Sequence, residues 1–210
     1  MAGRADAGAS HATHLFNGMR PLHHREPGPV GPLLDRDEVS CEVIADGVHL
    51  HDTAIRLVAR AAGPARLVLI TDAMAAAGMP DGRYQLGSMR VDVAGGVARL
   101  AADAGSGADA GSGADAGSGG DAGSGVPGAI AGSTATMASV VRHAAAAGLP
   151  VIDVAAAAST NPARVLGLAG RTGALCPGLD ADLVVCDETF GLRAVMRRGE
   201  WVTRSRGPNP

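Results

Sequence analysis

Short apolar runs alternate with helical patterns in the first half of the chain. Residues 39–45 ("VSCEVIA") and 66–70 ("RLVLI") are rich in β-branched residues and end abruptly in polar ones. This is typical of strands buried on both faces of a parallel sheet. Between them, "HDTAIRLVARAAG" carries apolar residues at helical spacing and stops at Gly63. With another strand expected to end near His14, the pattern predicts an α/β fold.

The period of the pattern changes in the second half. Residues 83–100 alternate apolar and polar positions and turn at Gly95-Gly96, which predicts a β-hairpin. Helical spacing returns in residues 133–149, after a Ser/Thr cap, and in residues 151–168, where a proline opens the second part. Residues 172–204 have strand and turn signals without helices, so we expect a small β-domain after a larger one spanning 1–171.

One segment has a different character. Residues 103–125 repeat "DAGSGA" with a six-residue period and contain almost only Gly, Ser, Ala and Asp. Such a composition cannot bury enough apolar area to offset its conformational entropy, so it predicts a disordered insertion, and we expect a disordered tail at 205–210. A calcium-binding β-roll would need a nine-residue period with an apolar anchor.

Composition and charge narrow the function classes. The net charge is −3 and no long basic run occurs, which argues against nucleic acid and anionic membranes as partners. The three cysteines lack metal-binding spacing, and no run approaches 18 apolar residues. We therefore expect a cytoplasmic protein with an aliphatic core.

Polar residues follow each expected strand. His14 stands near the end of the first, and the following Asn17-Gly18 would expose backbone amides there, although a lone histidine is more often structural. Arg25 in "HHREPG" lies on a loop stiffened by proline and suits bidentate binding of phosphate or carboxylate, with a solvated surface arginine as the alternative.

The other two strand ends carry carboxylates and histidines. Asp46 precedes His49, for which we favour substrate binding, while His49 and His51 could form a His-x-His metal pair if the stretch is extended. Asp72 follows "RLVLIT", so a carboxylate is brought to the end of a buried strand. There it can exchange protons with an attacking water and a leaving amine, or else cap a following helix.

Taken together, seven blocks in order resemble the N-acetylglucosamine-6-phosphate deacetylases of the amidohydrolase superfamily. They are "THLFNGM", "HHREPG", "ADGVHLH", "LITDAMAAAG", "IAGSTATM", "STNPARVLGL" and "GLDADLVV". The resemblance implies a metal-containing (β/α)8 barrel with a small β-sandwich, a homodimer, and removal of acetate from N-acetyl-D-glucosamine 6-phosphate.

The resemblance also implies a role for each site residue. His14 would be a ligand of a divalent metal ion such as zinc or iron, and Asp72 would be the general acid/base. The implied substrate-binding residues are Asn17, Gly18, Arg25, Asp46, His49, Ile130, Ala131 and Gly132.

The chain resembles only the C-terminal part of such an enzyme, with about three barrel strands and a piece of the sandwich. The family's further metal ligands come from upstream strands, so we expect weak metal binding and an uncovered, apolar sheet face. We also expect the chain to be active as a deacetylase only when the missing half is present. Two other hypotheses stay open: a non-catalytic sugar-phosphate-binding remnant, and a different amidohydrolase acting on a cyclic amide. The "HHREPG" block argues against the cyclic amide, since an arginine loop suits a phosphorylated substrate.

Overall fold

The computed structural model describes residues 8–101 and 128–204. The predictions of disorder for residues 103–125 and 205–210 lie outside the described residues. Within those ranges, no helix is long and apolar enough to cross a membrane.

A parallel sheet forms the first part of the fold. Its strands are β1 (His11–Ala12), β2 (Ser40–Ile44) and β3 (Leu67–Ile70), hydrogen-bonded in that order. Both pairings are parallel, and the connections between the strands are long enough for the crossovers that parallel strands need. The predicted α/β class and the three strand positions are confirmed, although β1 is only two residues long and leaves His14 in a turn.

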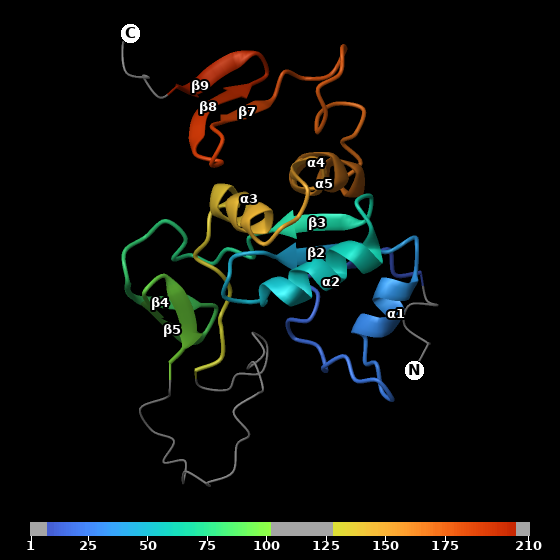
Figure 1. Cartoon of the computed structure of the whole chain (residues 1–210). Helices are drawn as coiled ribbons and strands as arrows, with labels where there is room; N and C mark the ends of the chain where they lie inside the picture. Colours follow the sequence, from blue (N-terminus) through green and yellow to red (C-terminus); the bar gives the residue numbers. More distant parts are fainter. Residues whose placement is uncertain (1–7, 102–127, 205–210) are drawn as a thin grey trace, which may run out of the picture.

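In the described part of the chain, six helical segments pack around this sheet (Figure 1). They are α1 (Val30–Asp35), α2 (Asp52–Ala62), α3 (Met137–Ala146), α4 (Val151–Ala155), the π-helical η2 (Ala156–Thr160) and α5 (Asn161–Val165). The side chain of Thr136 accepts from the amide of Ser139 in a capping box that fixes the start of α3. The sequence had not predicted α1, and the helix expected over residues 151–168 is divided by the π-helical turn.

The main core lies between the sheet and these helices. Cys41 and Val43 of β2 pack with Leu67 and Leu69 of β3 in this core, joined by helical residues such as Val140. The other residues of the strands face the opposite side, where Ile44 and Val68 are nevertheless buried. The expectation of an uncovered apolar sheet face is therefore wrong for this sheet.

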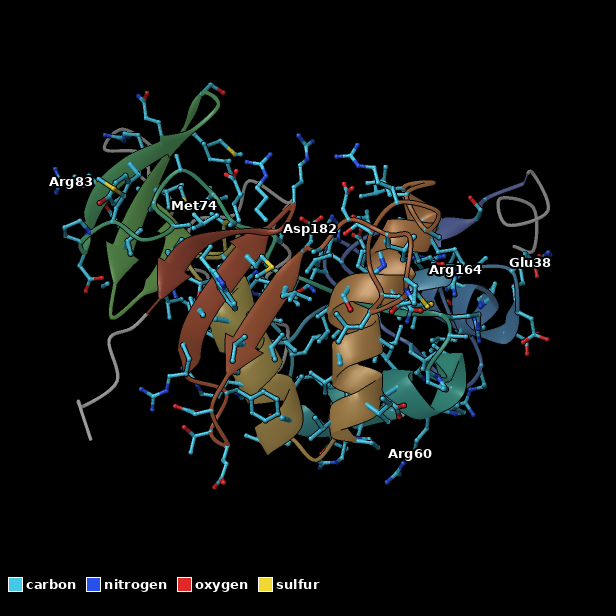
Figure 2. All side chains as sticks on the ribbon, turned by 90° about the horizontal axis from the view of Figure 1, so that it is seen from above. Glu38, Arg60, Met74, Arg83, Arg164 and Asp182 are labelled. Carbon is cyan, nitrogen blue, oxygen red and sulfur yellow. The ribbon has the colours of Figure 1, made fainter. Side chains whose placement is uncertain are left out.

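An antiparallel sheet follows β3. It contains β4 (Gly82–Leu86), β5 (Met89–Ala94) and β6 (Val97–Leu100), so the predicted hairpin is a three-stranded meander with an additional turn before β5. Its inner face packs against Met74 and Ala131 in a second core. Figure 2 shows Met74 beside this sheet and Arg83 at its outer rim.

A second antiparallel sheet ends the described chain. It consists of β7 (Leu183–Cys186), β8 (Leu192–Arg197) and β9 (Glu200–Arg204). Figure 1 shows α3 and α4 between it and the parallel sheet. Its apolar side chains are poorly covered, since Val184 is 67% and Val202 65% exposed. This sheet therefore exposes apolar side chains, as do α4, with Ile152 at 77%, and the segment before β7, with Leu175 at 83%.

Candidate active site

Two residues with left-handed backbones stand at the carboxyl ends of the parallel strands. His14 follows β1 with φ +33°, and Asp72 follows β3 with φ +50°. This conformation costs a non-glycine residue about 1–3 kcal/mol and persists only where its surroundings hold it. Both residues line the same cavity of about 290 Å³, together with Gly18, Met74 and Gly132. The sequence does not predict this backbone strain, but it does predict that both side chains lie at strand ends.

The ring of His14 is held by its own turn. Its Nδ1 lies 2.9 Å from the carbonyl oxygen of Asn17, and the amide of Asn17 in turn donates to the carbonyl of His14. With Nδ1 hydrogen-bonded, Nε2 is the nitrogen available to a ligand. The prediction that the Asn17 amide would be exposed for binding is wrong, because the turn uses it. Gly18 faces the ring, since an added Cβ would lie 3.7 Å from His14 Cε1.

Glu42 supports this turn from the neighbouring strand. One carboxylate oxygen lies 2.7 Å from His11 Nε2, while the other accepts from the Thr13 hydroxyl and from the amide of His14. Burial alone would raise the pKa of Glu42, but the hydrogen bonds from His11 and Thr13 outweigh it and lower the pKa. Sequence reasoning missed this residue, although a glutamate inside the apolar run "VSCEVIA" was a visible signal.

Asp72 is anchored through its backbone. Its carbonyl accepts from the amide of Ser133 at 2.8 Å, and the amide of Met74 donates to the carbonyl of Ser133 at 2.9 Å. Residues 75–78 form turns, so the alternative that Asp72 caps a helix is wrong. Among the described residues, no hydrogen bond occupies its half-buried carboxylate, which leaves the group free to exchange protons in the cavity.

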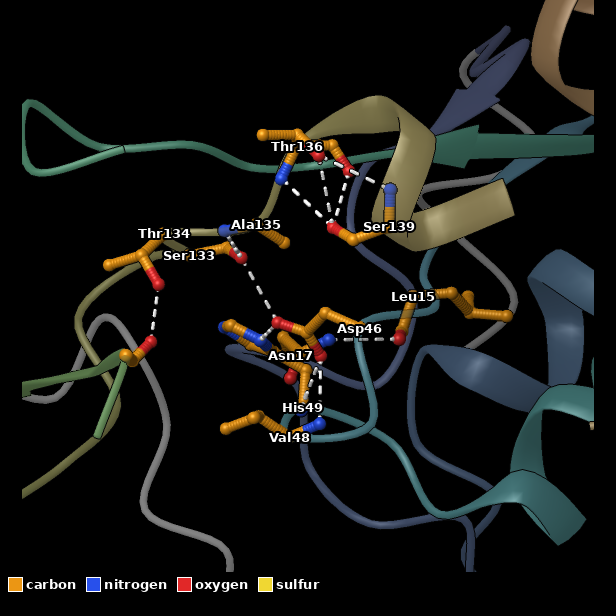
Figure 3. A network of polar contacts seen from close by, with 11 residues as sticks. Leu15, Asn17, Asp46, Val48, His49, Ser133, Thr134, Ala135, Thr136 and Ser139 are labelled. Carbon is orange, nitrogen blue, oxygen red and sulfur yellow. Dashed lines mark hydrogen bonds and ion pairs between the residues drawn. The ribbon is translucent and has the colours of Figure 1, made fainter. Parts of the chain in front are cut away.

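Asp46 and His49 form a buried pair at the end of β2 (Figure 3). The exposed fractions of their side chains are 5% and 1%. Asp46 Oδ2 lies 2.8 Å from His49 Nδ1 and accepts from the Ser133 hydroxyl at 3.0 Å. Burial would raise the pKa of Asp46, but hydrogen bonds from the ring and amide of His49 and the amide of Val48 lower it to about 2.

A second cavity of about 220 Å³ adjoins the first. Asp46, His49 and Ser133 line it, as does the Gly95-Gly96 turn between β5 and β6. Gly132 lines both cavities, because its φ of +75° lets the chain pass close to Asp72. The two cavities are thus neighbouring compartments, one holding His14 and Asp72, the other His49.

Other candidates lie outside the cavities. Arg25 is exposed on its loop and lines neither, and its amide donates to His23 Nδ1 at 3.3 Å. Ile130 and Ala131 serve in backbone pairing with β6, and Ala131 is completely buried.

His51 is exposed and caps α2 by accepting from the amide of Thr53, whereas the ring of His49 is buried on Asp46. The His49–His51 metal pair is therefore not formed.

The donors for a metal ion are few. His14 and Asp72 are the two ligand-type side chains in the first cavity. Over residues 8–101 and 128–204, no group of three or more His, Cys, Asp or Glu side chains could hold a metal ion. A catalytic metal usually takes three protein ligands and keeps one position open. The described residues do not by themselves fit a catalytic metal site.

The amidohydrolase family matches residues 2–202. The chain belongs to this family. Among curated amidohydrolases, it is 39% identical over 204 residues to the N-acetylglucosamine-6-phosphate deacetylase of Danio rerio, covering 94% of this chain and 44% of that one. It is also 39% identical over 196 residues to the N-acetylgalactosamine-6-phosphate deacetylase of Escherichia coli O157:H7, covering 93% and 45%.

A solved structure extends this likeness to the fold. The N-acetyl-D-glucosamine-6-phosphate deacetylase of Mycobacterium smegmatis, a variant in complex with N-acetyl-D-glucosamine-6-phosphate, aligns with a TM-score of 0.75 at 45% identity. The alignment covers 94% of this amidohydrolase chain and 46% of that one. The resemblance to these deacetylases is confirmed, and the chain spans about half the length of these three relatives.

Proposed function

We propose that this chain provides the acid/base and sugar-binding part of a deacetylase in amino-sugar catabolism. The reaction hydrolyses N-acetyl-D-glucosamine 6-phosphate to D-glucosamine 6-phosphate and acetate. One observation carries the proposal: His14 and Asp72 come from separate strands, both have left-handed backbones, and both line one cavity. The seven sequence blocks that point to deacetylases include both residues.

Asp72 is the proposed general acid/base. Its carboxylate takes a proton from water as the water oxygen bonds to the acetyl carbon. When the C–N bond breaks, Asp72 returns this proton to the leaving amine, and the products are acetate and the free amino sugar. A carboxylate without a competing hydrogen bond suits both transfers.

The sugar phosphate would occupy the two compartments. Gly18 and Gly132 permit close approach to the reacting group, while Asn17 and the pair of Asp46 and His49 lie on the strand-end loops beside it. Ile130 and Ala131 remain proposed sugar contacts, and this role requires their segment, which pairs with β6, to approach the cavities. Arg25 remains the proposed phosphate ligand, and this role requires its loop to approach the cavity.

A divalent metal ion, zinc or iron, remains part of the proposal for the complete site. His14 would be its ligand through Nε2. Because the described residues supply too few donors, we expect this chain to bind the metal weakly, and no step above passes through it. The finer architecture is proposed likewise: part of a (β/α) barrel with a piece of a β-sandwich, in a homodimer.

Two observations favour an alternative function and an alternative substrate. The short donor set favours a non-catalytic sugar-phosphate-binding protein, in which binding would not respond to a chelator. The equal identity to an N-acetylgalactosamine-6-phosphate deacetylase makes the epimeric sugar a second candidate substrate.

Acetate release from both sugar phosphates, with zinc or iron and with a chelator, separates these possibilities. The proposal expects release that requires the 6-phosphate, so unphosphorylated N-acetylglucosamine is the control. Binding that a chelator does not change, without any acetate release, would contradict the enzymatic proposal and support the binding protein.

A further inference from the structure

The carboxylate of Asp46 has no capacity left for a substrate. Oδ1 accepts from the amides of Val48 and His49, both at 2.9 Å. Oδ2 faces His49 Nδ1 at 2.8 Å and the Ser133 hydroxyl at 3.0 Å. Two oxygens of a carboxylate offer about four acceptor positions, and four donors fill them. Asp46 is thus a poor candidate for a direct substrate contact, although it lines the second cavity.

The same geometry fixes the proton of the His49 ring. The pKa of Asp46 is lowered to about 2, so at neutral pH the carboxylate carries no proton to donate. The proton in the 2.8 Å contact must therefore lie on Nδ1 of His49. In free imidazole either ring nitrogen can carry the proton, whereas here the carboxylate of Asp46 fixes it on Nδ1.

Nε2 of His49, unlike Nδ1, is not held by a hydrogen bond to any described residue. It is buried and has no hydrogen-bond partner within the described part of the chain. A buried polar atom without a partner costs about 1–3 kcal/mol, so such atoms in native proteins call for a ligand or water. His49 also lines the second cavity, which adjoins the one holding His14 and Asp72.

We propose that Asp46 is a positioning residue, which with Ser133 holds the His49 ring with Nδ1 protonated, so that Nε2 is the atom that meets the sugar phosphate. The identity of that ligand rests on the proposed function, but the arrangement of the ring does not. In the neutral ring Nε2 accepts a hydrogen bond from a hydroxyl or amide, and in the charged ring it donates one to phosphate.

Ser133 connects the Asp46–His49 pair to Asp72. Its hydroxyl donates to Asp46 and accepts from the amide of Ala135 at 2.9 Å, while its backbone pairs with Asp72. One residue therefore fixes both the carboxylate behind His49 and the strained backbone of Asp72.

Nuclear magnetic resonance of the 15N-labelled chain at about pH 8 tests the inference, because long-range proton–nitrogen correlations distinguish the two tautomers of a neutral histidine. The signals of His49 are those missing from the spectrum of His49→Gln. We expect a protonated Nδ1 and an unprotonated Nε2 in the wild type. Protonation of Nε2 instead would overturn the inference, whatever the variants do.

Asp46→Asn sharpens the test without changing the side-chain size. Its oxygen can still accept from the amides of Val48 and His49, so its NH₂ faces the ring and we expect the proton to move to Nε2. Asp52→Asn makes the same change at the other aspartate–histidine pair, where Asp52 Oδ1 lies 2.9 Å from His143 Nε2, and should leave His49 unchanged. An unchanged tautomer in Asp46→Asn would contradict the inference.

Titration with N-acetylglucosamine 6-phosphate provides the ligand arm. We expect the Nε2 signal to shift in the wild type and the apparent affinity to fall about tenfold in Asp46→Asn, because a protonated Nε2 no longer accepts a hydrogen bond from a sugar hydroxyl or amide. Binding that leaves Nε2 unmoved would overturn the ligand contact. No binding, with Nδ1 protonated, would count against the proposed function while supporting the role of Asp46.

Discussion

The amide of Ser133 donates to the backbone carbonyl of Asp72 over 2.8 Å, which joins the strand end carrying the proposed acid/base to a loop 61 positions further along the chain. This contact and its partner from Met74 hold Asp72 in its left-handed conformation. Gly132 makes the approach possible, because an added Cβ would lie 3.2 Å from the Asp72 carbonyl oxygen and 3.3 Å from Met74 Cβ.

Gly132→Ala should therefore destabilise the fold by more than backbone strain alone. A non-glycine residue at positive φ costs about 1–2 kcal/mol, and the close contacts add to this. Gly63→Ala is the matched control, with φ +70° against +75° at Gly132 and no atom within 4 Å of the added Cβ. Urea unfolding of both variants checks this expectation. Equal losses would show that the close approach to Asp72 has no energetic weight.

Acid should weaken the fold through Asp46. Its folded-state pKa of about 2 lies below the unfolded value, so its stabilising contribution is complete above about pH 4 and is lost as the pH falls toward 2. For this buried group the contribution is about 2 kcal/mol. In Asp46→Asn, the decrease in unfolding free energy between pH 4 and pH 2 should be smaller by about this amount.

The control for this experiment is Ser133→Ala, which keeps the carboxylate and its contacts with His49 and Val48. It should retain most of the pH dependence. Parallel pH profiles for wild type and Asp46→Asn would show that other carboxylates account for acid unfolding.

Residues 103–125 should be removable. The residues on either side are already paired, since the amide of Leu100 donates to Ala129 O at 2.9 Å and the amide of Gly128 donates to Leu100 O at 2.8 Å. A deletion shortens the connection between paired ends, and loop-closure entropy changes slowly with length. We expect the unfolding free energy to change by less than about 1 kcal/mol. A larger loss would show that the repeat contributes to packing.

The sheet of β7–β9 should promote self-association. Val184 and Val202 are more than half exposed, and edge strands with apolar side chains readily pair with other chains. The double variant Val184→Thr, Val202→Thr should reduce concentration-dependent light scattering while leaving the unfolding free energy nearly unchanged. Val93→Thr is the buried control on β5 and should destabilise the fold instead. Unchanged scattering in the double variant would place the association elsewhere.

The sequence predicted those features that depend on local patterns. Buried β-branched runs gave the positions of β2 and β3, and the polar residue after each run gave Asp46 and Asp72. Ordered sequence blocks, rather than periodicity, indicated the family. A carboxylate after a buried strand indicates a functional role, because the packing of the apolar strand does not require it.

Other features depend on contacts between distant residues and could not be read from local patterns. Glu42 meets His11 and the turn of His14 across neighbouring strands, and Ser133 meets Asp46 over 87 positions. The π-helical turn within the predicted helix has no local signature either. The phosphate-binding role of Arg25 stays a prediction, because its loop lies outside both cavities.

The central claim is that Asp72 exchanges protons with the substrate in the cavity it shares with His14. The most direct test is acetate release from N-acetylglucosamine 6-phosphate, with divalent metal supplied, by wild type, Asp72→Asn and the control Asp153→Asn on α4. We predict that Asp72→Asn lowers the rate by about 100-fold or more and that Asp153→Asn leaves it unchanged. Acetate release that survives undiminished in Asp72→Asn would contradict the claim.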